Sequence, residues 1–176
     1  MSGERRHLVL VGLMGSGKTE VGRECARRLG RPFVDTDALV EARAGRSIAD
    51  IFRHDGEDAF RLLERDAVAH ACASPEPAVI SCGGGAVLSE ENRRVMRGEG
   101  TVVLLTAPVE VLAARVGAGE GRPLLGSAEP ADVLACLAAE RDDAYRAAAH
   151  VAVDTSGHDL VAVADDVLAC LDEVDG

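Results

Sequence analysis

Lysine is almost missing from this chain. Of its 19 lysine and arginine residues, a single one is lysine, Lys18, and all the others are arginine. The composition favours arginine wherever a basic side chain is needed, so the lone lysine marks a place that a guanidinium does not suit. A compact ammonium on a flexible stem reaches between crowded anionic oxygens, where a planar guanidinium fits poorly. With no second lysine, the Asn-Lys-x-Asp segment by which GTPase switches read guanine is excluded.

Aromatic residues and long apolar runs are scarce as well. The chain has no tryptophan, one tyrosine and three phenylalanines, so its core must be built from Ala, Val and Leu. It shows no apolar run of membrane length and no secretory signal pattern, so we expect a cytoplasmic enzyme. Its five cysteines form no Cys-x-x-Cys pair and no zinc spacing, and we expect small core residues in a reducing compartment. They are Cys25, Cys72, Cys82, Cys136 and Cys170.

Positive charge is in deficit over the whole chain. The net charge of −11 disfavours binding to nucleic acid or to an anionic membrane through a general electrostatic field. Local clusters of arginine can still hold a small anionic molecule. A length of 176 residues with 47% hydrophobic content predicts one globular domain with a full core.

The segment that contains the lysine carries the strongest motif. Residues 12–19, GLMGSGKT, match the P-loop pattern G-x-x-x-x-G-K-[ST]. A short apolar run at 7–11 precedes the loop, and helical spacing of apolar residues follows it. In this arrangement backbone N–H groups cradle phosphate, Lys18 reaches the β- and γ-phosphates, and the Thr19 hydroxyl binds Mg²⁺. The loop residues that we expect at the nucleotide are Gly12, Met14, Gly15, Ser16, Gly17, Lys18 and Thr19.

Strand and helix patterns alternate along the chain. Such repeated βα units predict an α/β fold of three layers, α/β/α, in which helices cover both faces of a five-stranded parallel sheet. The expected strands are 7–11, one ending at 34–35, 78–81, 101–105 and 150–153. The expected helices are 21–29, 37–44, a turn at 47–52, 57–72, 89–98, 108–116, 130–149 and 159–174.

We expect one kinase domain over residues 1–176. Its core sheet and P-loop fall in 7–35, an acceptor-binding segment in about 37–72, and a Gly-, Pro- and Arg-rich lid in about 117–130. Motor and remodelling ATPases are normally larger, which leaves a small phosphotransferase of the P-loop NTPase fold, similar to the nucleoside monophosphate kinases. A lid suits this class, because a kinase must keep water away from the transferred phosphoryl group.

Two carboxylates and three glycines follow neighbouring strands. Asp35 and Asp37 stand two apart, which puts both on one side of an extended segment, although Asp37 could instead cap the next helix. The glycines at 83–85 come after the third strand, at the sheet edge where open α/β folds bind ligands. Without a Cβ they let a ligand approach the backbone closely, or they simply make a tight turn.

Six motifs together carry a family resemblance. They occur in this order: GLMGSGKT at 12–19, DTD at 35–37, F-R-x-x-E at 60–64, GGG at 83–85, RPLL at 122–125 and R-x-x-x-Y at 141–145. In this combination the chain resembles the shikimate kinases from Leu8 to about Ala164. The resemblance implies ATP-dependent phosphorylation of the 3-hydroxyl of shikimate, giving 3-phosphoshikimate and ADP, in aromatic amino-acid biosynthesis.

The resemblance also implies roles for the acceptor residues. Asp35 assists Mg²⁺, mostly through water. Asp37 hydrogen-bonds the acceptor hydroxyls, and it either takes the proton of the attacking one or chiefly orients it. The glycines Gly83, Gly84 and Gly85 contact shikimate. Arg61 and Arg141 hold its carboxylate, for which the two parallel N–H groups of a guanidinium are suited. Within the helix, Glu64 can pair with Arg61 and fix its direction.

Two further arginines are matched to the nucleotide. Arg122, in the expected lid, stabilises charge on the transferring group, and Arg115 lies near adenine, although it could simply complement a helix C-terminus. Tyr145 is expected to pack and support Arg141. The strand at 78–81 lacks the usual Walker-B aspartate, and Ser81 stands near the metal position instead. Three other arginines are expected to lie in solvent: Arg53, Arg65 and Arg146.

Two rival functions compete with this one. A gluconate-type sugar-acid kinase of similar size would share the P-loop, but it does not predict the whole set of acceptor motifs. A non-catalytic nucleotide-binding regulatory module would keep Lys18 and Thr19 but would need no acceptor arginines. The expected small molecules are ATP, with Mg²⁺, and shikimate; we expect no nucleic acid or membrane partner, and a monomer.

Overall fold

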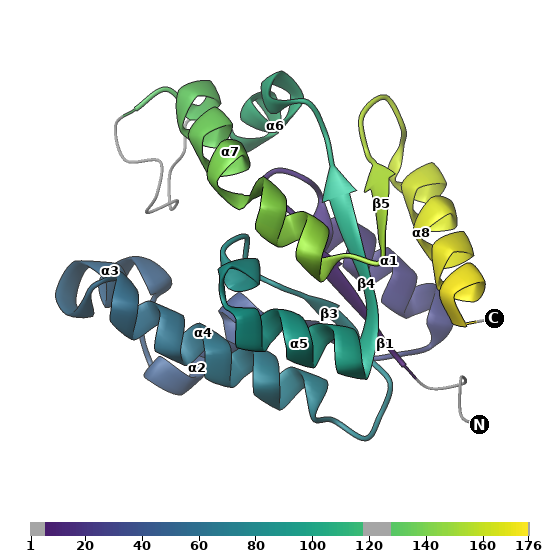
Figure 1. The fold of residues 1–176 in the computed structure, drawn as a ribbon, viewed down its shortest axis with the longest axis horizontal. Helices are drawn as coiled ribbons and strands as arrows, with labels where there is room; N and C mark the ends of the chain where they lie inside the picture. The colour runs from purple at the N-terminus through teal and green to yellow at the C-terminus, as the bar shows by residue number, and fades with distance from the viewer. Residues whose placement is uncertain (1–5, 118–127, 176) are drawn as a thin grey trace.

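A computed structural model describes residues 6–117 and 128–175 of the chain. Its centre is a parallel sheet of five strands in the order β2-β3-β1-β4-β5 (Figure 1). The strands are β1 (His7–Val11), β2 (Phe33–Asp35), β3 (Val79–Ser81), β4 (Gly100–Thr106) and β5 (Val151–Asp154). The predicted five-stranded parallel sheet is therefore confirmed.

Helices alternate with the strands. They are α1 (Lys18–Leu29), α2 (Thr36–Ala44), α3 (Ile48–Asp55), α4 (Glu57–Cys72), α5 (Glu90–Glu99), α6 (Val109–Val116), α7 (Pro130–Ala148) and α8 (Leu160–Asp175), with a 3₁₀ turn η1 (Ala86–Leu88). The segment expected as one turn at 47–52 is a longer helix, because Ser47 caps it and no breaker intervenes before Gly56.

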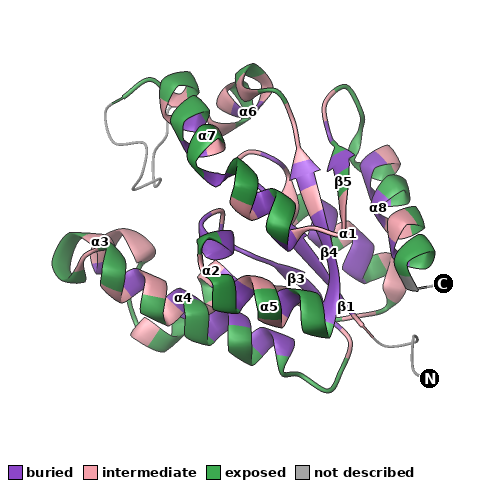
Figure 2. Cartoon of the chain, viewed as in Figure 1, coloured by how far each residue is buried: buried purple, intermediate pink, exposed green. Residues whose placement is uncertain are grey.

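The alternation of side chains along β1 explains the three layers. Leu8 and Leu10 point to one face of the sheet, where they pack in a cluster with residues of α1 and α8. Val9 and Val11 point to the opposite face, where the cluster includes residues of α4, α5, α6 and α7. The expected α/β/α sandwich is thus present, and buried residues run through both interfaces (Figure 2).

A third and smaller cluster lies apart from the sheet. Val40, Ile51, Phe60 and Ala67 are its buried members, and they come from α2, α3 and α4. These three helices extend beyond the sheet on one side of the molecule (Figure 1). The segment that we expected to bind the acceptor therefore has a core of its own.

The cysteine prediction is right at three positions, partly right at Cys170, which packs against the cluster of α1 and α8, and wrong at Cys136. Cys25, Cys72 and Cys82 are buried, but Cys136 is exposed and Cys170 is half-buried. Cys136 lies on the solvent face of α7, since its neighbours Leu134 and Leu137 supply the buried side of that helix. None of the described helices is long and apolar enough to cross a membrane.

Candidate active site

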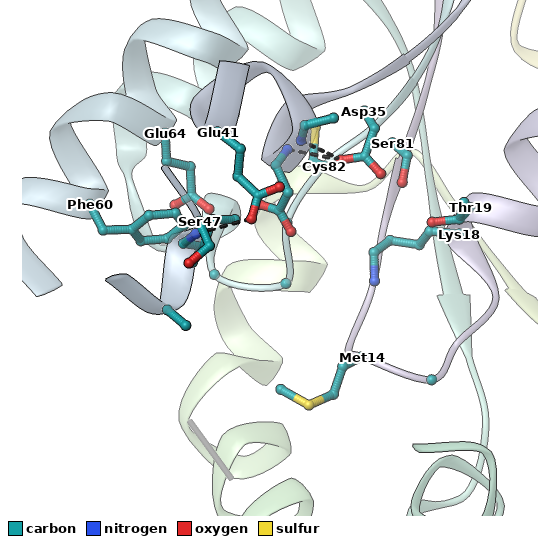
Figure 3. Close-up of a pocket in the computed structure, with 18 of the residues that line it drawn as sticks. Met14, Lys18, Thr19, Asp35, Glu41, Ser47, Phe60, Glu64, Ser81 and Cys82 are labelled. Atoms are coloured by element: carbon teal, nitrogen blue, oxygen red, sulfur yellow. Dashed lines mark hydrogen bonds between the residues drawn. The ribbon is translucent and has the colours of Figure 1, made fainter. Parts of the chain in front are cut away.

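A cleft of about 890 Å³ opens along the carboxyl ends of β1, β2 and β3. Parallel strands end at one sheet edge, and the register pairs Asp35 with Ser81 and Ser81 with Leu10, which leads into the P-loop. Figure 3 shows Lys18 and Thr19 on one side of this cleft and Phe60, Glu64 and Glu41 on the other. Two separate groups of side chains therefore face one space.

The P-loop forms the first side of the cleft. Met14, Gly15, Gly17, Lys18 and Thr19 line it, and α1 begins at Lys18. The Lys18 ammonium donates to the backbone oxygens of Gly12 at 2.7 Å and Leu13 at 3.0 Å, so the loop wraps around this side chain. The helix N-terminus and the ammonium together make this end of the cleft attractive to phosphate.

Two of the loop residues that we expect at the nucleotide do not line the cleft. Ser16 is fully buried, and neither it nor Gly12 lines the cleft. A Cβ on Gly12, whose φ is +152°, would come within 2.6 Å of the Leu105 oxygen and 2.8 Å of the Ser16 hydroxyl. Glycine at position 12 therefore lets the loop pack against β4, which shapes the loop from behind.

Asp35 caps the helix that follows it. Its Oδ1 accepts hydrogen bonds from the N–H groups of Asp37 at 2.9 Å and Ala38 at 3.2 Å. The alternative that Asp37 caps α2 is wrong, and so is the idea that both carboxylates share an extended segment. The chain turns into α2 at Thr36, so Asp37 lies in its first helical turn. Asp35 still lines the cleft together with Thr19 and Ser81.

Asp37 is a carboxylate of the cleft whose ionisation the fold changes. Its pKa is raised from 3.8 to about 6, chiefly because burial removes water from the carboxylate, and then because Asp35 and Glu64 repel its charge. Lys18 opposes this shift. A carboxylate with such a pKa is a better proton acceptor near neutral pH than an ordinary aspartate.

Arg61 is held by carboxylates on both sides. Its guanidinium donates to Glu64 Oε1 at 2.9 Å and to Glu57 Oε1 at 3.0 Å, and it lies 5.2 Å from the ring centre of Phe60. Glu64 is 2% exposed, and burial raises the pKa of its carboxyl while Arg61 counteracts this effect. The predicted pair of Arg61 and Glu64 is therefore present, with one partner buried.

Arg141 comes into the same region from α7. It lines the cleft although it is 3% exposed, and its Nε finds no hydrogen-bond partner among the described residues. Tyr145, expected to support this arginine, donates its hydroxyl to the Gly84 oxygen at 2.6 Å. The tyrosine thus fastens α7 to the glycine segment. The guanidinium of Arg141 is buried yet keeps unused donor capacity, which suits an anionic ligand.

The three glycines leave room for these charged groups. A Cβ on Gly83 would lie 2.6 Å from Asp37 Oδ1 and 2.9 Å from Glu64 Oε2, and one on Gly85 would overlap the Arg61 guanidinium. Neither Gly83 nor Gly85 has a positive φ. Their glycine identity therefore follows from the close approach of side chains, beyond the needs of a turn.

An apolar wall and one more carboxylate were not predicted. Ile48, Phe52 and Phe60 line the acceptor side, and the two phenylalanine rings lie 4.8 Å apart. Glu41 also lines it and accepts a hydrogen bond from the Ile48 N–H at 3.0 Å. Phe60 is a buried member of the third cluster and also lines the cleft, so one side chain serves both the core and the wall.

Arg115 joins the P-loop to the loop after β5. It donates to the Gly15 oxygen at 3.2 Å, to Thr155 Oγ1 at 2.8 Å and to the Thr155 oxygen at 3.0 Å. It also lines the cleft. Arg122 and most of the expected lid at 117–130 lie outside the described residues.

The arginines expected in solvent are there. Arg53, Arg65 and Arg146 pair with acidic residues at exposed positions, at 3.2 Å, 3.5 Å and 3.0 Å respectively. Such exposed pairs contribute little to stability. These side chains provide matched surface controls for the arginines of the cleft.

The chain is similar to known proteins along nearly its whole length. It is 51% identical to the shikimate kinase of Symbiobacterium thermophilum, over 95% of this chain and 97% of that protein. A structure of the Acinetobacter baumannii shikimate kinase in complex with shikimate matches with a TM-score of 0.93 and 34% identity, over 97% of this chain and 95% of that one.

A more distant structure shares the fold alone. The gluconokinase of Sinorhizobium meliloti matches with a TM-score of 0.60 and 24% identity, over 97% of this chain and 93% of that one. A family model described as shikimate kinase matches residues 14–172, which include the P-loop lysine and the elements that line the cleft. The chain therefore belongs to the shikimate kinase family.

Proposed function

We propose that this protein transfers the γ-phosphoryl group of ATP to the 3-hydroxyl of shikimate, giving 3-phosphoshikimate and ADP. The observation that carries the proposal is the division of the cleft. The P-loop lies at one side, and Arg61, Arg141 and the buried carboxylate of Glu64 lie at the other. Donor and acceptor can therefore meet in one cleft, and phosphoryl transfer depends chiefly on such positioning.

The acceptor site suits a small hydroxylated carboxylate. Arg61 and Arg141 supply two guanidinium groups for the carboxylate, and the glycines at 83–85 bring backbone close to the ring. Because Glu57 and Glu64 hold Arg61 on both sides, its guanidinium is oriented before a ligand arrives. Such preorganisation lowers the entropy that binding costs.

Asp37 faces the attacking hydroxyl in this proposal. Its carboxylate accepts the hydrogen bond of the 3-hydroxyl and directs an oxygen lone pair toward the phosphorus. With a pKa raised to about 6, the group is ionised at neutral pH and still basic enough to take the proton as the new bond forms. Orientation remains its larger contribution, because the transition state of phosphoryl transfer is loose.

The residues at the phosphate end fit Mg²⁺. Thr19 supplies a hydroxyl and Asp35 a carboxylate, both lining the cleft, and oxygen donors of this kind suit a cation that retains water and phosphate ligands. We place Asp35 in contact through water, since its Oδ1 already caps α2. When bound, the metal neutralises charge on the β- and γ-phosphates.

Two arginines complete the proposed nucleotide site. Arg115 lines the cleft beside Gly15 and is assigned to the adenine end. Arg122 is assigned to the transferring phosphoryl group on the strength of the motif at 122–125. We also propose a monomer acting in the cytoplasm, because residues of one chain line both ends of the cleft and ATP is available there.

A coupled assay of ADP release tests the function. With ATP and Mg²⁺ present, we expect shikimate to stimulate ADP release strongly, while gluconate and buffer do not. Stimulation by gluconate alone would support a sugar-acid kinase. Nucleotide binding without stimulation by either acid would support a regulatory module and refute the proposal.

The acceptor assignment is tested by Arg61→Ala. We expect the KM for shikimate to rise about 10- to 100-fold, since a buried charge-assisted contact is lost, while the Kd for ADP changes less than about twofold. Arg65→Ala is the matched control, because Arg65 lies on the same helix but is half-exposed and pairs with Glu91. A large loss of ADP affinity in Arg61→Ala would place this arginine in the wrong site.

A further inference from the structure

Two of the three described hydrogen bonds of the Arg115 guanidinium go to one residue, Thr155. Two of its donor nitrogens bond to Thr155, one to the side-chain oxygen at 2.8 Å and the other to the backbone oxygen at 3.0 Å. The third bond, at 3.2 Å, goes to Gly15 in the P-loop. A guanidinium with both ends of its fork engaged cannot rotate freely, so its plane is fixed.

Thr155 is itself anchored firmly. It is 3% exposed and directly follows β5. Its N–H donates to the Thr106 oxygen at 2.8 Å and its hydroxyl donates to the same oxygen at 3.2 Å. Because the hydroxyl proton is directed to Thr106, the hydroxyl oxygen presents lone pairs to Arg115. The sheet edge at β4 and β5 therefore determines where the guanidinium lies.

The helix that carries Arg115 is seated on the P-loop. A Cβ on Gly15, whose φ is +82°, would lie 2.9 Å from the Leu112 oxygen and 3.0 Å from Val116 Cγ2. The backbone of α6 is therefore packed directly against the P-loop at Gly15. Arg115, in the last turn of α6, extends across Gly15 toward Thr155. Its bonds go to other segments, which sets it apart from a charge that merely complements the end of its own helix.

The three hydrogen bonds of Arg115 do not involve the flat faces of its guanidinium. Hydrogen bonds from a guanidinium lie in its plane, and all three described bonds are of this kind. The flat faces are the surfaces on which a guanidinium stacks against an aromatic ring. Arg115 lines the cleft and Thr155 does not, so the threonine acts from behind the arginine.

We propose that Thr155 is a positioning residue for the nucleotide, which holds the Arg115 guanidinium edge-on so that its face is presented to the base. The proposal rests on the proposed function to the extent that Arg115 serves the nucleotide end of the cleft. The loop after β5, at 154–157, contains no arginine, and none of its residues lines the cleft. We therefore expect this loop to act on the nucleotide through Arg115, to which Thr155 is bonded.

The decisive variant is Thr155→Val, which keeps the shape of the side chain and removes its hydroxyl. The Thr106 oxygen keeps its bond from the residue 155 N–H, so no buried carbonyl is orphaned. We expect the Kd for ADP and the KM for ATP to rise roughly three- to tenfold, as for the loss of one charge-assisted hydrogen bond in a half-exposed setting. The kcat and the KM for shikimate should stay within about twofold.

Two companion variants separate positioning from a structural effect. Thr155→Ser retains the hydroxyl and should restore ADP affinity to within about twofold of the wild type. Thr106→Val removes a hydroxyl that donates to the Val153 oxygen at the same sheet edge. The described hydrogen bonds of Arg115 go to Gly15 and Thr155, so this variant should leave ADP affinity unchanged. Equal losses in Thr155→Val and Thr106→Val would overturn the proposal.

A double-mutant cycle completes the test. If Thr155 acts through Arg115, adding Thr155→Val to Arg115→Ala should cause no further loss of ADP affinity, whereas additive losses would refute the proposal. The readout is calorimetric titration with ADP alone, after thermal unfolding has shown each variant to be folded. Because no acceptor is present, failure here is distinguishable from failure of the shikimate assay.

Discussion

At the scale of single residues, burial decides what the charged groups of the cleft can do. Asp35 and Asp37 are two apart in the sequence, yet one caps a helix and the other carries a pKa raised to about 6. Arg61 and Arg65 lie on one helix, yet one is braced by Glu64 and the other pairs with Glu91 at the surface. Residue type limits the possible chemistry, and the local environment selects the role.

The raised pKa of Asp37 predicts an acid limb in the pH profile. Below about pH 6 the carboxyl is protonated and cannot accept the proton of the attacking hydroxyl, so kcat/KM for shikimate should fall about tenfold per pH unit. Asp37→Asn should lose at least about 100-fold in activity and should lack this limb. Initial rates between pH 5 and 8 test this, and an unchanged limb in Asp37→Asn would assign it to another group.

The same group predicts the sign of a stability change. The folded-state pKa of about 6 lies above the unfolded value near 3.8, so the folded protein binds the proton more tightly. The stabilising contribution of Asp37 is therefore complete below about pH 4 and lost as the pH rises through 6. Asp37→Asn should be more stable than the wild type at pH 8, by about 1–3 kcal/mol, and this gain should vanish near pH 4. Urea unfolding at both pH values measures it.

At the scale of secondary-structure elements, the cleft depends on close approaches between neighbours. The turn after β3 meets α4 where Gly85 faces Arg61, and the P-loop meets α6 where Gly15 faces Leu112. The first contact is made with the end of a flexible side chain and the second with backbone. A substitution at the first therefore displaces a functional group, whereas one at the second disturbs the packing of two elements.

Gly85→Ala should damage acceptor binding and lower stability. Its Cβ would overlap the guanidinium of Arg61, which must then leave its position beside Glu64. We expect the KM for shikimate to rise at least about tenfold, with a loss of stability of about 1–3 kcal/mol, because the buried carboxylate of Glu64 loses its pairing with Arg61. Steady-state kinetics and thermal unfolding measure both effects.

Gly98→Ala is the matched control for this prediction. A Cβ there meets nothing within 4 Å, and the residue lies within α5, so kinetics should be unchanged. Stability should rise by up to about 1 kcal/mol, since alanine favours a helix over glycine. A normal KM for shikimate in Gly85→Ala would contradict the placement of Arg61.

At the scale of the whole molecule, three hydrophobic clusters support different parts of the cleft. Two clusters fill the faces of the sheet and hold the P-loop edge, and the third supports the acceptor side through α2, α3 and α4. The helix α4 reaches both its own cluster and the sheet, through Phe60 at one end and Val68 farther along. The nucleotide end therefore rests on the larger cores and the acceptor end on the smaller one.

Ile51→Ala should loosen the acceptor end selectively. Ile51 is fully buried in the third cluster, so its truncation should cost about 2–4 kcal/mol locally. Hydrogen exchange should speed up mainly within residues 36–67, and the KM for shikimate should rise while the Kd for ADP stays within about twofold. Ile80→Ala, in the sheet core, should instead lower protection throughout the described chain. Uniform loss of protection in both variants would contradict a separate acceptor core.

Local patterns in the sequence are sufficient to predict the fold class, the P-loop and the family. These depend on local signals: alternation of apolar residues within strands, their helical spacing between them, and a glycine-rich loop whose geometry is set by its own eight residues. The boundaries of α4 and the pairing of Arg61 with Glu64 follow from the same short range. The cysteines were expected in the core because of their scattered spacing, which does not record the helix face on which each one lies, and the prediction was wrong at Cys136 for this reason.

The electrostatics and geometry of the cleft depend on contacts between segments that are distant in the sequence. The pKa of Asp37 depends on Glu64 and Lys18, which are distant in sequence, and Arg141 is buried because α7 packs over the glycine segment. Thr155 meets Arg115 across 40 residues. Desolvation and hydrogen bonding depend on which segments are in contact in the folded chain, and a local sequence pattern does not specify those contacts. Residue types could therefore be matched to roles, whereas the geometry and electrostatics behind each role come from the folded chain.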